Sequence, residues 1–146
     1  SAVLSFLRRE GDAYQTIATK AGEYAAEWTV ESLPPAERVL LRRAPAWLRV
    51  RLVLRLFRRL VQESYQESRA TTRLRRGTAS VAVLPSVFCT VREPVEHPLC
   101  GYYAAALSRL LVLFDLRAQP RILTCRGRGE GSCSLTAALA SPEVAA

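Results

Sequence analysis

Several features that are common in proteins are scarce or missing in this chain of 146 residues. Methionine is absent, and we expect that a start residue has been trimmed or replaced. No apolar run reaches the ~18 residues that a helix needs to cross a bilayer, which argues against a transmembrane segment. Arg8, Arg9 and Glu10 follow only a short apolar start, so we expect no secretory signal peptide and a cytoplasmic location.

Lysine is equally scarce, because Lys20 is the single lysine among 21 basic residues, and the net charge is +8. A basic, arginine-rich composition is typical of nucleic-acid-binding proteins. Here the arginines are spread over amphipathic segments, without interleaved exposed aromatic residues or a known nucleic-acid-binding motif. We therefore expect a basic solvated surface and no nucleic-acid partner.

The composition is that of a globular protein, with 49% apolar and 23% charged residues. A chain of this length can bury a core of its own, so we expect one domain over residues 1–146. We predict a helical part over residues 1–70. Residues 75–138 are expected to supply a strand, a buried helix and a hairpin that contains cysteines.

The first predicted helix covers residues 2–31 and is expected to break near Gly11. Its apolar side chains recur at steps of three and four, which places them on one face. That face consists of Tyr14, Ile17, Ala18, Ala21, Tyr24, Ala25 and Trp28. The small residues in it, together with Gly22, would let another helix approach closely. The face is interpreted as core packing or as a dimer seam, and we predict a homodimer.

Two further helices are predicted, over Pro35–Arg43 and Trp47–Gln66. The second has a wide apolar arc and a narrow stripe of arginines (Arg51, Arg55, Arg58 and Arg59). A basic amphipathic helix at a membrane surface would share this pattern. The width of the apolar arc favours a helix packed between layers of a core.

The second half of the chain changes its periodicity. Residues 69–77 are interpreted as a polar, basic connection, and Thr78–Leu84 alternates as a strand does. Leu99–Leu116 is apolar almost all round, which predicts a buried helix. Residues 121–125 and 132–138 are expected to form a hairpin. The predicted fold class is therefore α+β, with helices packed on one face of a small antiparallel sheet.

All four cysteines and the only histidine lie in this half: Cys89, His97, Cys100, Cys125 and Cys133. Thiols from a helix start and two facing strands would converge well enough to hold zinc, which takes four ligands. Buried thiols and a disulfide (Cys125–Cys133 or Cys89–Cys100) are the alternatives. Cys100 beside His97 would also suit nucleophilic catalysis. No third orienting group is evident, so we expect a non-enzymatic protein with no catalytic residues.

These residues form a pattern that resembles a known family. Ser86-Val-Phe-Cys89 is followed by Pro98-Leu-Cys100-Gly-Tyr-Tyr at a helix start, and then by the glycine-rich hairpin Cys125–Cys133. The pattern is similar to the 4-vinyl reductase (4VR) domain family, which shares its fold with vesicle-tethering subunits of the TRAPP complex. The match covers residues 75–138. It implies a dimeric ligand-binding or scaffolding domain, because family members include phenol-responsive sensory domains, a bacteriochlorophyll-synthesis accessory protein and acyl-binding tethering subunits.

The resemblance also implies a metal site. Sensory domains of the family hold zinc with cysteines that match Cys100, Cys125 and Cys133. Their fourth ligand is an acidic residue three positions before the first hairpin cysteine, where this chain has Ile122. Cys89 and His97 are therefore the candidates for the fourth ligand here.

The predicted function is that of a small-molecule sensor or scaffold. The helices over 47–61 and 99–116 present more apolar surface than a three-stranded sheet covers, so we predict a closed apolar pocket between helices and sheet for an apolar or aromatic ligand. Its predicted lining is Trp47, Val50, Leu54, Phe57, Tyr102, Tyr103 and Leu107. The alternatives are a tethering module that binds a protein partner or an acyl chain, and an accessory factor of tetrapyrrole metabolism.

Overall fold

The computed structural model describes residues 12–64, 69–75, 77–84, 101–124 and 133–139. The described part contains four helices and four strands. The helices are α2 (Asp12–Glu31), α3 (Pro35–Arg43), α4 (Ala46–Ser64) and α5 (Gly101–Leu113). The strands are β1 (Arg69–Arg75), β2 (Thr78–Leu84), β3 (Arg121–Thr124) and β4 (Cys133–Ala138).

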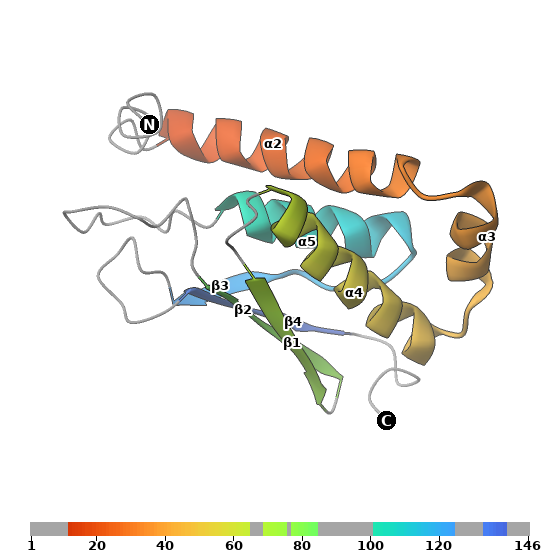
Figure 1. Cartoon of the computed structure of the whole chain (residues 1–146). Helices are drawn as coiled ribbons and strands as arrows, with labels where there is room; N and C mark the ends of the chain where they lie inside the picture. Colours follow the sequence, from red (N-terminus) through yellow and green to blue (C-terminus); the bar gives the residue numbers. More distant parts are fainter. Residues whose placement is uncertain (1–11, 65–68, 76, 85–100, 125–132, 140–146) are drawn as a thin grey trace.

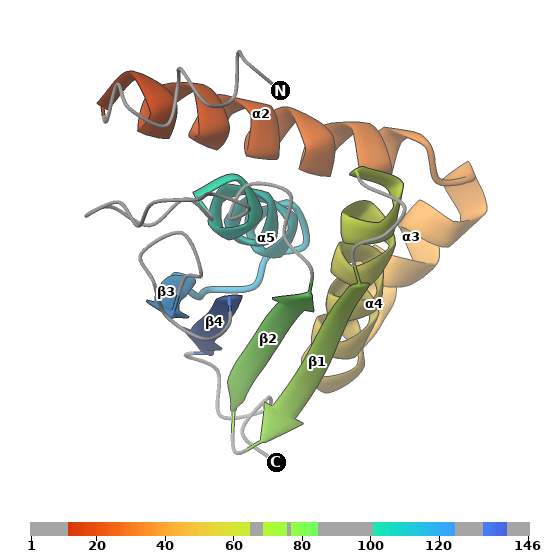
Figure 2. The ribbon, with the colours of Figure 1, turned by 60° about the vertical axis from the view of Figure 1, so that its left-hand side comes forward.

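The four strands form one sheet in the order β1-β2-β4-β3, and every neighbouring pair is antiparallel. The helices stack over one side of this sheet (Figure 1). Figure 2 shows α5 between α2 and the strands β3 and β4, while α4 runs along β1. The predicted fold class, helices packed on a small antiparallel sheet, is confirmed.

Helices α2, α3 and α4 follow the sequence prediction closely. The predicted helical stretch before Asp12, with its break near Gly11, lies outside the described residues. Pro35 occupies the first turn of α3, where its missing N–H costs nothing, and Arg42 and Arg43 fill the last turn. The Arg49 side chain then joins α3 to α4, because its Nη1 donates to the carbonyl oxygens of Arg42 (3.4 Å) and Ala44 (3.3 Å). These carbonyls lie at the end of α3, where no further turn of helix satisfies them.

The buried helix α5 ends earlier than predicted, at Leu113 and not at Leu116. Asp115 has a φ of 56°, which is the left-handed region and cannot continue a right-handed helix. The backbone N–H of Leu116 donates back to the carbonyl of Leu111 at 2.8 Å, so the chain turns where the helix stops. Phe114 and Leu116 are buried although they lie beyond the helix. The sequence therefore stays apolar through the turn, and this is why the predicted helix was too long.

The segment interpreted as a polar connection is a strand, which corrects the sequence prediction. Arg69–Arg75 pairs with β2 along its whole length, with Thr72 opposite Val81 and Arg73 opposite Ser80. The prediction failed because the arginines dominated the composition of this segment. The alternation is present nevertheless, since Ala70, Thr72 and Leu74 are half-buried while the residues between them are exposed. An edge strand of this kind tolerates a charged outward side.

The hairpin prediction is confirmed within the described residues. Cys133–Ala138 lies beside β2, and Arg121–Thr124 pairs with it at the edge of the sheet. The register shifts between Ile122 and Thr124, so Leu123 is an extra residue on the edge strand. Cys125 and Ser132, also predicted in these strands, lie outside the described residues.

Small residues bring α2 and α5 into close contact. A Cβ added at Gly22 would lie 2.2 Å from the backbone oxygen of Tyr102 and 3.0 Å from the Cβ of Ala105. Ala18 and Ala26, about one turn on either side of Gly22, are 5% and 0% exposed. The predicted close approach of a second helix is therefore made within this chain, by α5.

The sequence predicted no transmembrane segment, and the observed helices can be compared with that prediction. Among the residues that the structure describes, no helix is both long enough and apolar enough to cross a membrane.

Candidate functional site

An aromatic cluster lies where α4 and α5 meet. The ring of Tyr103 is fully buried and contacts Phe57 of α4 edge to face, with ring centres 6.4 Å apart at 82°. Tyr102 contacts Tyr103 in the same way, at 5.3 Å and 77°. Each edge-to-face pair adds about 0.5–1.5 kcal/mol beyond the burial of its surface. The cluster therefore fixes how α4 and α5 are placed against each other.

Six of the seven residues predicted to line a ligand pocket belong to one buried core: Val50, Leu54, Phe57, Tyr102, Tyr103 and Leu107. Each is 9% exposed or less. Trp47, in the first turn of α4, is 49% exposed and does not belong to this core. The structure thus brings together the residues contributed by the middle of α4 and by α5.

Three of the surface hollows among the described residues were compared with the prediction, and none of the three is lined by the predicted pocket residues. The closed apolar pocket between helices and sheet therefore stays a prediction. Phe57 and Tyr103 are fully buried, and a densely packed core without a cavity is the alternative to a pocket, because protein interiors are normally dense.

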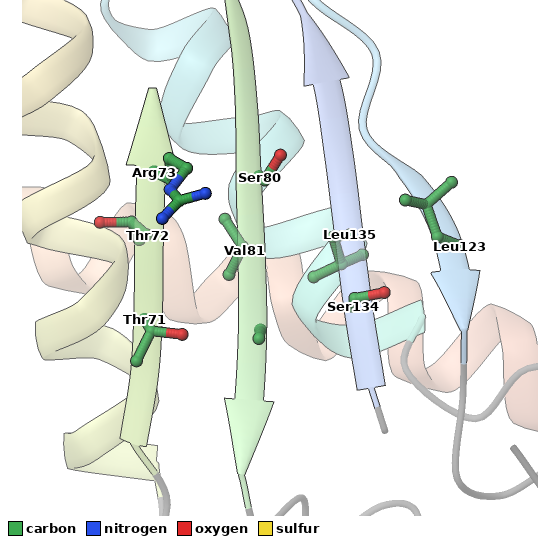
Figure 3. A pocket seen from close by; sticks show the side chains of 9 residues that line it. Thr71, Thr72, Arg73, Ser80, Val81, Leu123, Ser134 and Leu135 are labelled. Atoms are coloured by element: carbon green, nitrogen blue, oxygen red, sulfur yellow. The ribbon is translucent and has the colours of Figure 1, made fainter. Parts of the chain in front are cut away.

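The outward side of the sheet has a hollow of about 410 Å³. Figure 3 shows Thr71 and Arg73 projecting from β1, Ser80 from β2, Ser134 from β4 and Leu123 from β3 around it. The hollow exists because the central strands present small side chains on this side. Sequence analysis missed Thr71 and Arg73 because it assigned no strand there; the alternation of Ala70, Thr72 and Leu74 is the signal that would have found them.

Of the predicted metal ligands, the structure describes only Cys133. Its side chain is 2% exposed, and Cys133 pairs with Val83 at the beginning of β4. Cys89, His97, Cys100 and Cys125 lie outside the described residues. Within the described residues, no group of three or more His, Cys, Asp or Glu side chains is placed to hold a metal ion. A buried Cys133 fits both a zinc ligand and an inert core thiol, so the metal site stays a prediction.

The predicted apolar face of α2 has two different parts. Ala18 and Ala25 are packed into the core, whereas Ala21 is exposed. Three large residues of the face are also exposed: Ile17 by 49%, Tyr24 by 70% and Trp28 by 71%. The side chain of Tyr14 lies outside the described part of the chain. Ile17, Tyr24 and Trp28, together called the α2 stripe below, lie on one side of α2, with Trp28 one turn after Tyr24 and Ile17 two turns before it. Exposed large apolar side chains gathered on one side of a helix are typical of an interaction surface.

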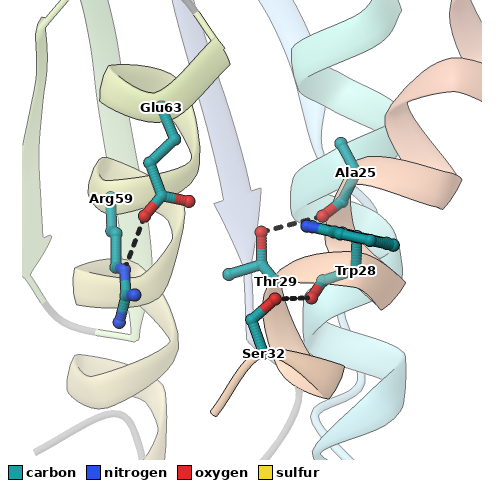
Figure 4. Close-up of polar contacts among 6 residues, drawn as sticks. All are labelled: Ala25, Trp28, Thr29, Ser32, Arg59 and Glu63. Carbon is teal, nitrogen blue, oxygen red and sulfur yellow. Dashed lines mark hydrogen bonds and ion pairs between the residues drawn. The ribbon is translucent and has the colours of Figure 1, made fainter.

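Polar contacts hold the helices locally (Figure 4). The hydroxyls of Thr29 and Ser32 donate to the carbonyl oxygens of Ala25 and Trp28, each at 2.8 Å. On α4, Arg59 Nε donates to Glu63 at 2.9 Å, and this hydrogen bond raises the pKa of the Arg59 guanidinium. Another ion pair joins Arg109 of α5 to Glu27 of α2 at 2.8 Å.

Comparison with known proteins gives a shared fold and no family. No family model matches the sequence, and no curated protein matches it. Seven chains of solved structures match. One of them is the crystal structure of the phenol-responsive sensory domain of the transcription activator PoxR with phenol. The two chains are 14% identical with a TM-score of 0.60, over 93% of this chain and 72% of the other. Similarity at this level of identity shows that this chain has the fold of that sensory domain.

Proposed function

We propose that this chain is a non-enzymatic sensory domain that binds a small apolar or aromatic molecule between its helices and its sheet. The observation that supports this most strongly is the fold, which matches a phenol-responsive sensory domain over 93% of the chain. The aromatic cluster of Phe57, Tyr102 and Tyr103 supports it further, because ligand sites are mainly apolar with a few polar groups. The tyrosine hydroxyls are the polar groups that we propose for anchoring a ligand.

The proposal includes membership of the 4VR domain family and a zinc ion held by Cys100, Cys125 and Cys133. Cys89 or His97 would complete the four ligands. When bound, zinc would fasten the start of α5 to the hairpin, and its binding energy would add to the stability of the fold. Elemental analysis of protein purified without chelator should then give about one zinc per chain, and Cys125→Ser should lower both the zinc content and the melting temperature.

The ligand proposal is tested by thermal unfolding in the presence of candidate molecules. A ligand that binds only the folded protein raises its stability, by about 2.7 kcal/mol at a concentration of 100 times Kd. Phenol and cresols represent the aromatic class, palmitate the acyl class and protoporphyrin the tetrapyrrole class. We expect the aromatic class to raise the melting temperature.

Two variants localise the effect. Tyr103→Phe removes a hydroxyl from the buried cluster and is expected to weaken the binding of phenol about tenfold, the loss that follows when one hydrogen bond is removed. Tyr24→Phe makes the same chemical change at a side chain that is 70% exposed, and should leave binding unchanged. If palmitate alone stabilises the protein, the result favours an acyl-binding tethering domain over a sensor of aromatic molecules. If protoporphyrin alone does so, it favours the accessory role in tetrapyrrole metabolism.

A second candidate function, a protein-interaction module, is favoured by the α2 stripe. We propose that the stripe is the contact of a homodimer, in which Ile17, Tyr24 and Trp28 meet the same residues of a second copy. Replacing Trp28 with Ala would remove a large aromatic contact from such an interface. We expect light scattering to give a dimer for the wild-type chain at tens of micromolar and a monomer for Trp28→Ala. A wild-type monomer would remove the dimer and leave the stripe for another partner.

A further inference from the structure

A second hollow, of about 350 Å³, lies between α4 and β1, and its lining is dominated by arginine. The lining residues are Arg55, Arg58, Arg59, Gln62, Arg69 and Ala70. Four of the six have a guanidinium group, and a fifth, Gln62, has an amide that can donate hydrogen bonds. No described acidic side chain lines the hollow. We call this set the arginine hollow.

The fold assembles this cluster from two distant parts of the chain. On α4, Arg55 lies three residues before Arg58 and four before Arg59, and this spacing puts all three on one side of the helix. Because α4 packs along β1, Arg69 at the beginning of that strand lines the same hollow. The sequence alone shows the three arginines of α4 as one stripe. That Arg69 joins them follows only from the packing of β1 against α4.

The positive charge in the arginine hollow is only partly balanced. Arg59 is paired with Glu63 on the next turn, and both side chains are about half exposed. Arg55 and Arg58 form no ion pair with any residue that the structure describes. Like charges at these helical spacings repel one another, so the hollow holds at least two positive charges that a bound anion would neutralise.

We propose that the arginine hollow binds a compact anion with two or more linked phosphate groups, such as the phosphate chain of a nucleotide or inorganic polyphosphate. A guanidinium group donates paired hydrogen bonds to phosphate oxygens, and several such groups around one hollow suit adjacent phosphates. A single carboxylate or orthophosphate would satisfy only part of the cluster. This site is separate from the aromatic cluster and goes beyond the proposed sensor function.

The test uses inorganic tripolyphosphate, pyrophosphate, orthophosphate and citrate in isothermal titration calorimetry at about 50 mM salt, where screening is moderate. Tripolyphosphate is expected to bind best, and orthophosphate at least tenfold more weakly. Citrate also has several negative charges, but they are carboxylates and not linked phosphates. We therefore expect citrate to bind more weakly than tripolyphosphate. Raising the salt to about 300 mM should weaken all binding, since the contacts are exposed.

A matched pair of variants separates the hollow from the overall charge. R55Q/R58Q and R42Q/R43Q each remove two positive charges, but Arg42 and Arg43 are exposed at the end of α3 and do not line the hollow. We expect R55Q/R58Q to weaken the binding of tripolyphosphate at least tenfold and R42Q/R43Q to change it less than twofold. Unfolding curves should show that both variants remain folded, because all four side chains are exposed.

Three outcomes would overturn the proposal. Equal weakening by both variants would mean that general charge attracts the anion. Binding of citrate as tight as that of tripolyphosphate would remove the preference for phosphate. Tighter binding of a 20-base-pair duplex, lost equally in the two variants, would indicate an extended nucleic-acid surface in place of a compact site.

Discussion

On the helix-facing side of the sheet, Val81, Val83 and Leu135 are each 2% exposed or less, whereas Arg73 and Ser80 are exposed on the outward side. Both sides belong to the same strands and alternate with the same period of two. The difference is that α4 and α5 cover one side, and no described helix covers the other (Figure 2). Stability should therefore depend on the helix-facing side, while the outward side is left for polar and charged contacts.

The two sides should differ most in how much a Leu→Ala replacement lowers the free energy of unfolding. Leu135 is 2% exposed on β4, and Leu123 is 55% exposed on β3. Leu135→Ala should lower the free energy of unfolding by about 2–5 kcal/mol, because it removes buried surface and leaves a cavity. Leu123→Ala should change it by less than about 0.5 kcal/mol. Urea unfolding of both variants measures the comparison, and equal losses would contradict it.

A contrast of intermediate size is expected between the two sides of α2. Gly22→Ala would normally stabilise a helix by about 0.5–1 kcal/mol. Here we expect it to destabilise the protein by about 1–3 kcal/mol, since the new Cβ would meet the Tyr102 backbone oxygen and α5 would have to move. Ala21→Leu adds a larger group on the exposed side of the same helix and should have an effect below about 0.5 kcal/mol. A stabilising effect of Gly22→Ala in thermal unfolding would show that the contact between α2 and α5 is looser.

The smallest contrast lies within the outward side itself. The hydroxyls of Thr124 and Ser134 are 2.7 Å apart and share a hydrogen bond between β3 and β4. Ser134→Ala should therefore cost about 0.5–1.5 kcal/mol. Ser80→Ala removes an exposed hydroxyl from β2 and should be close to neutral. Denaturant titrations resolve this difference only when the two variants are compared side by side, and indistinguishable curves would mean that the hydrogen bond contributes nothing.

The prediction of the fold from sequence succeeded where periodicity was strong. The apolar rows of α4, the all-round apolar character of α5 and the alternation of Thr78–Leu84 all correspond to observed elements. It failed at β1, where arginine on every outward position except Thr71 hid the alternation. It also placed the end of α5 too late, because the turn at Asp115 lies within an apolar run.

The candidate site was only partly predictable for a similar reason. Phe57, Tyr102 and Tyr103 were predicted to line one pocket, and the structure places their rings in contact with one another. Trp47 was expected with them, but it lies at the beginning of α4, at a point where its side chain stays half exposed. Helical spacing predicts on which face of the helix a residue lies. It does not predict how far along the helix the neighbouring element covers that face.

Local patterns in the sequence by themselves determined the α+β class, the apolar arc of α4 and the small-residue face of α2, since side-chain size and spacing act within a few residues. Only the tertiary structure decided that Gly22 faces α5 while Tyr24 and Trp28 face outward. It also decided that Arg69 joins Arg55 and Arg58 around one hollow. These outcomes depend on contacts between elements that are distant in the chain, and such contacts are set by how the helices and strands pack together.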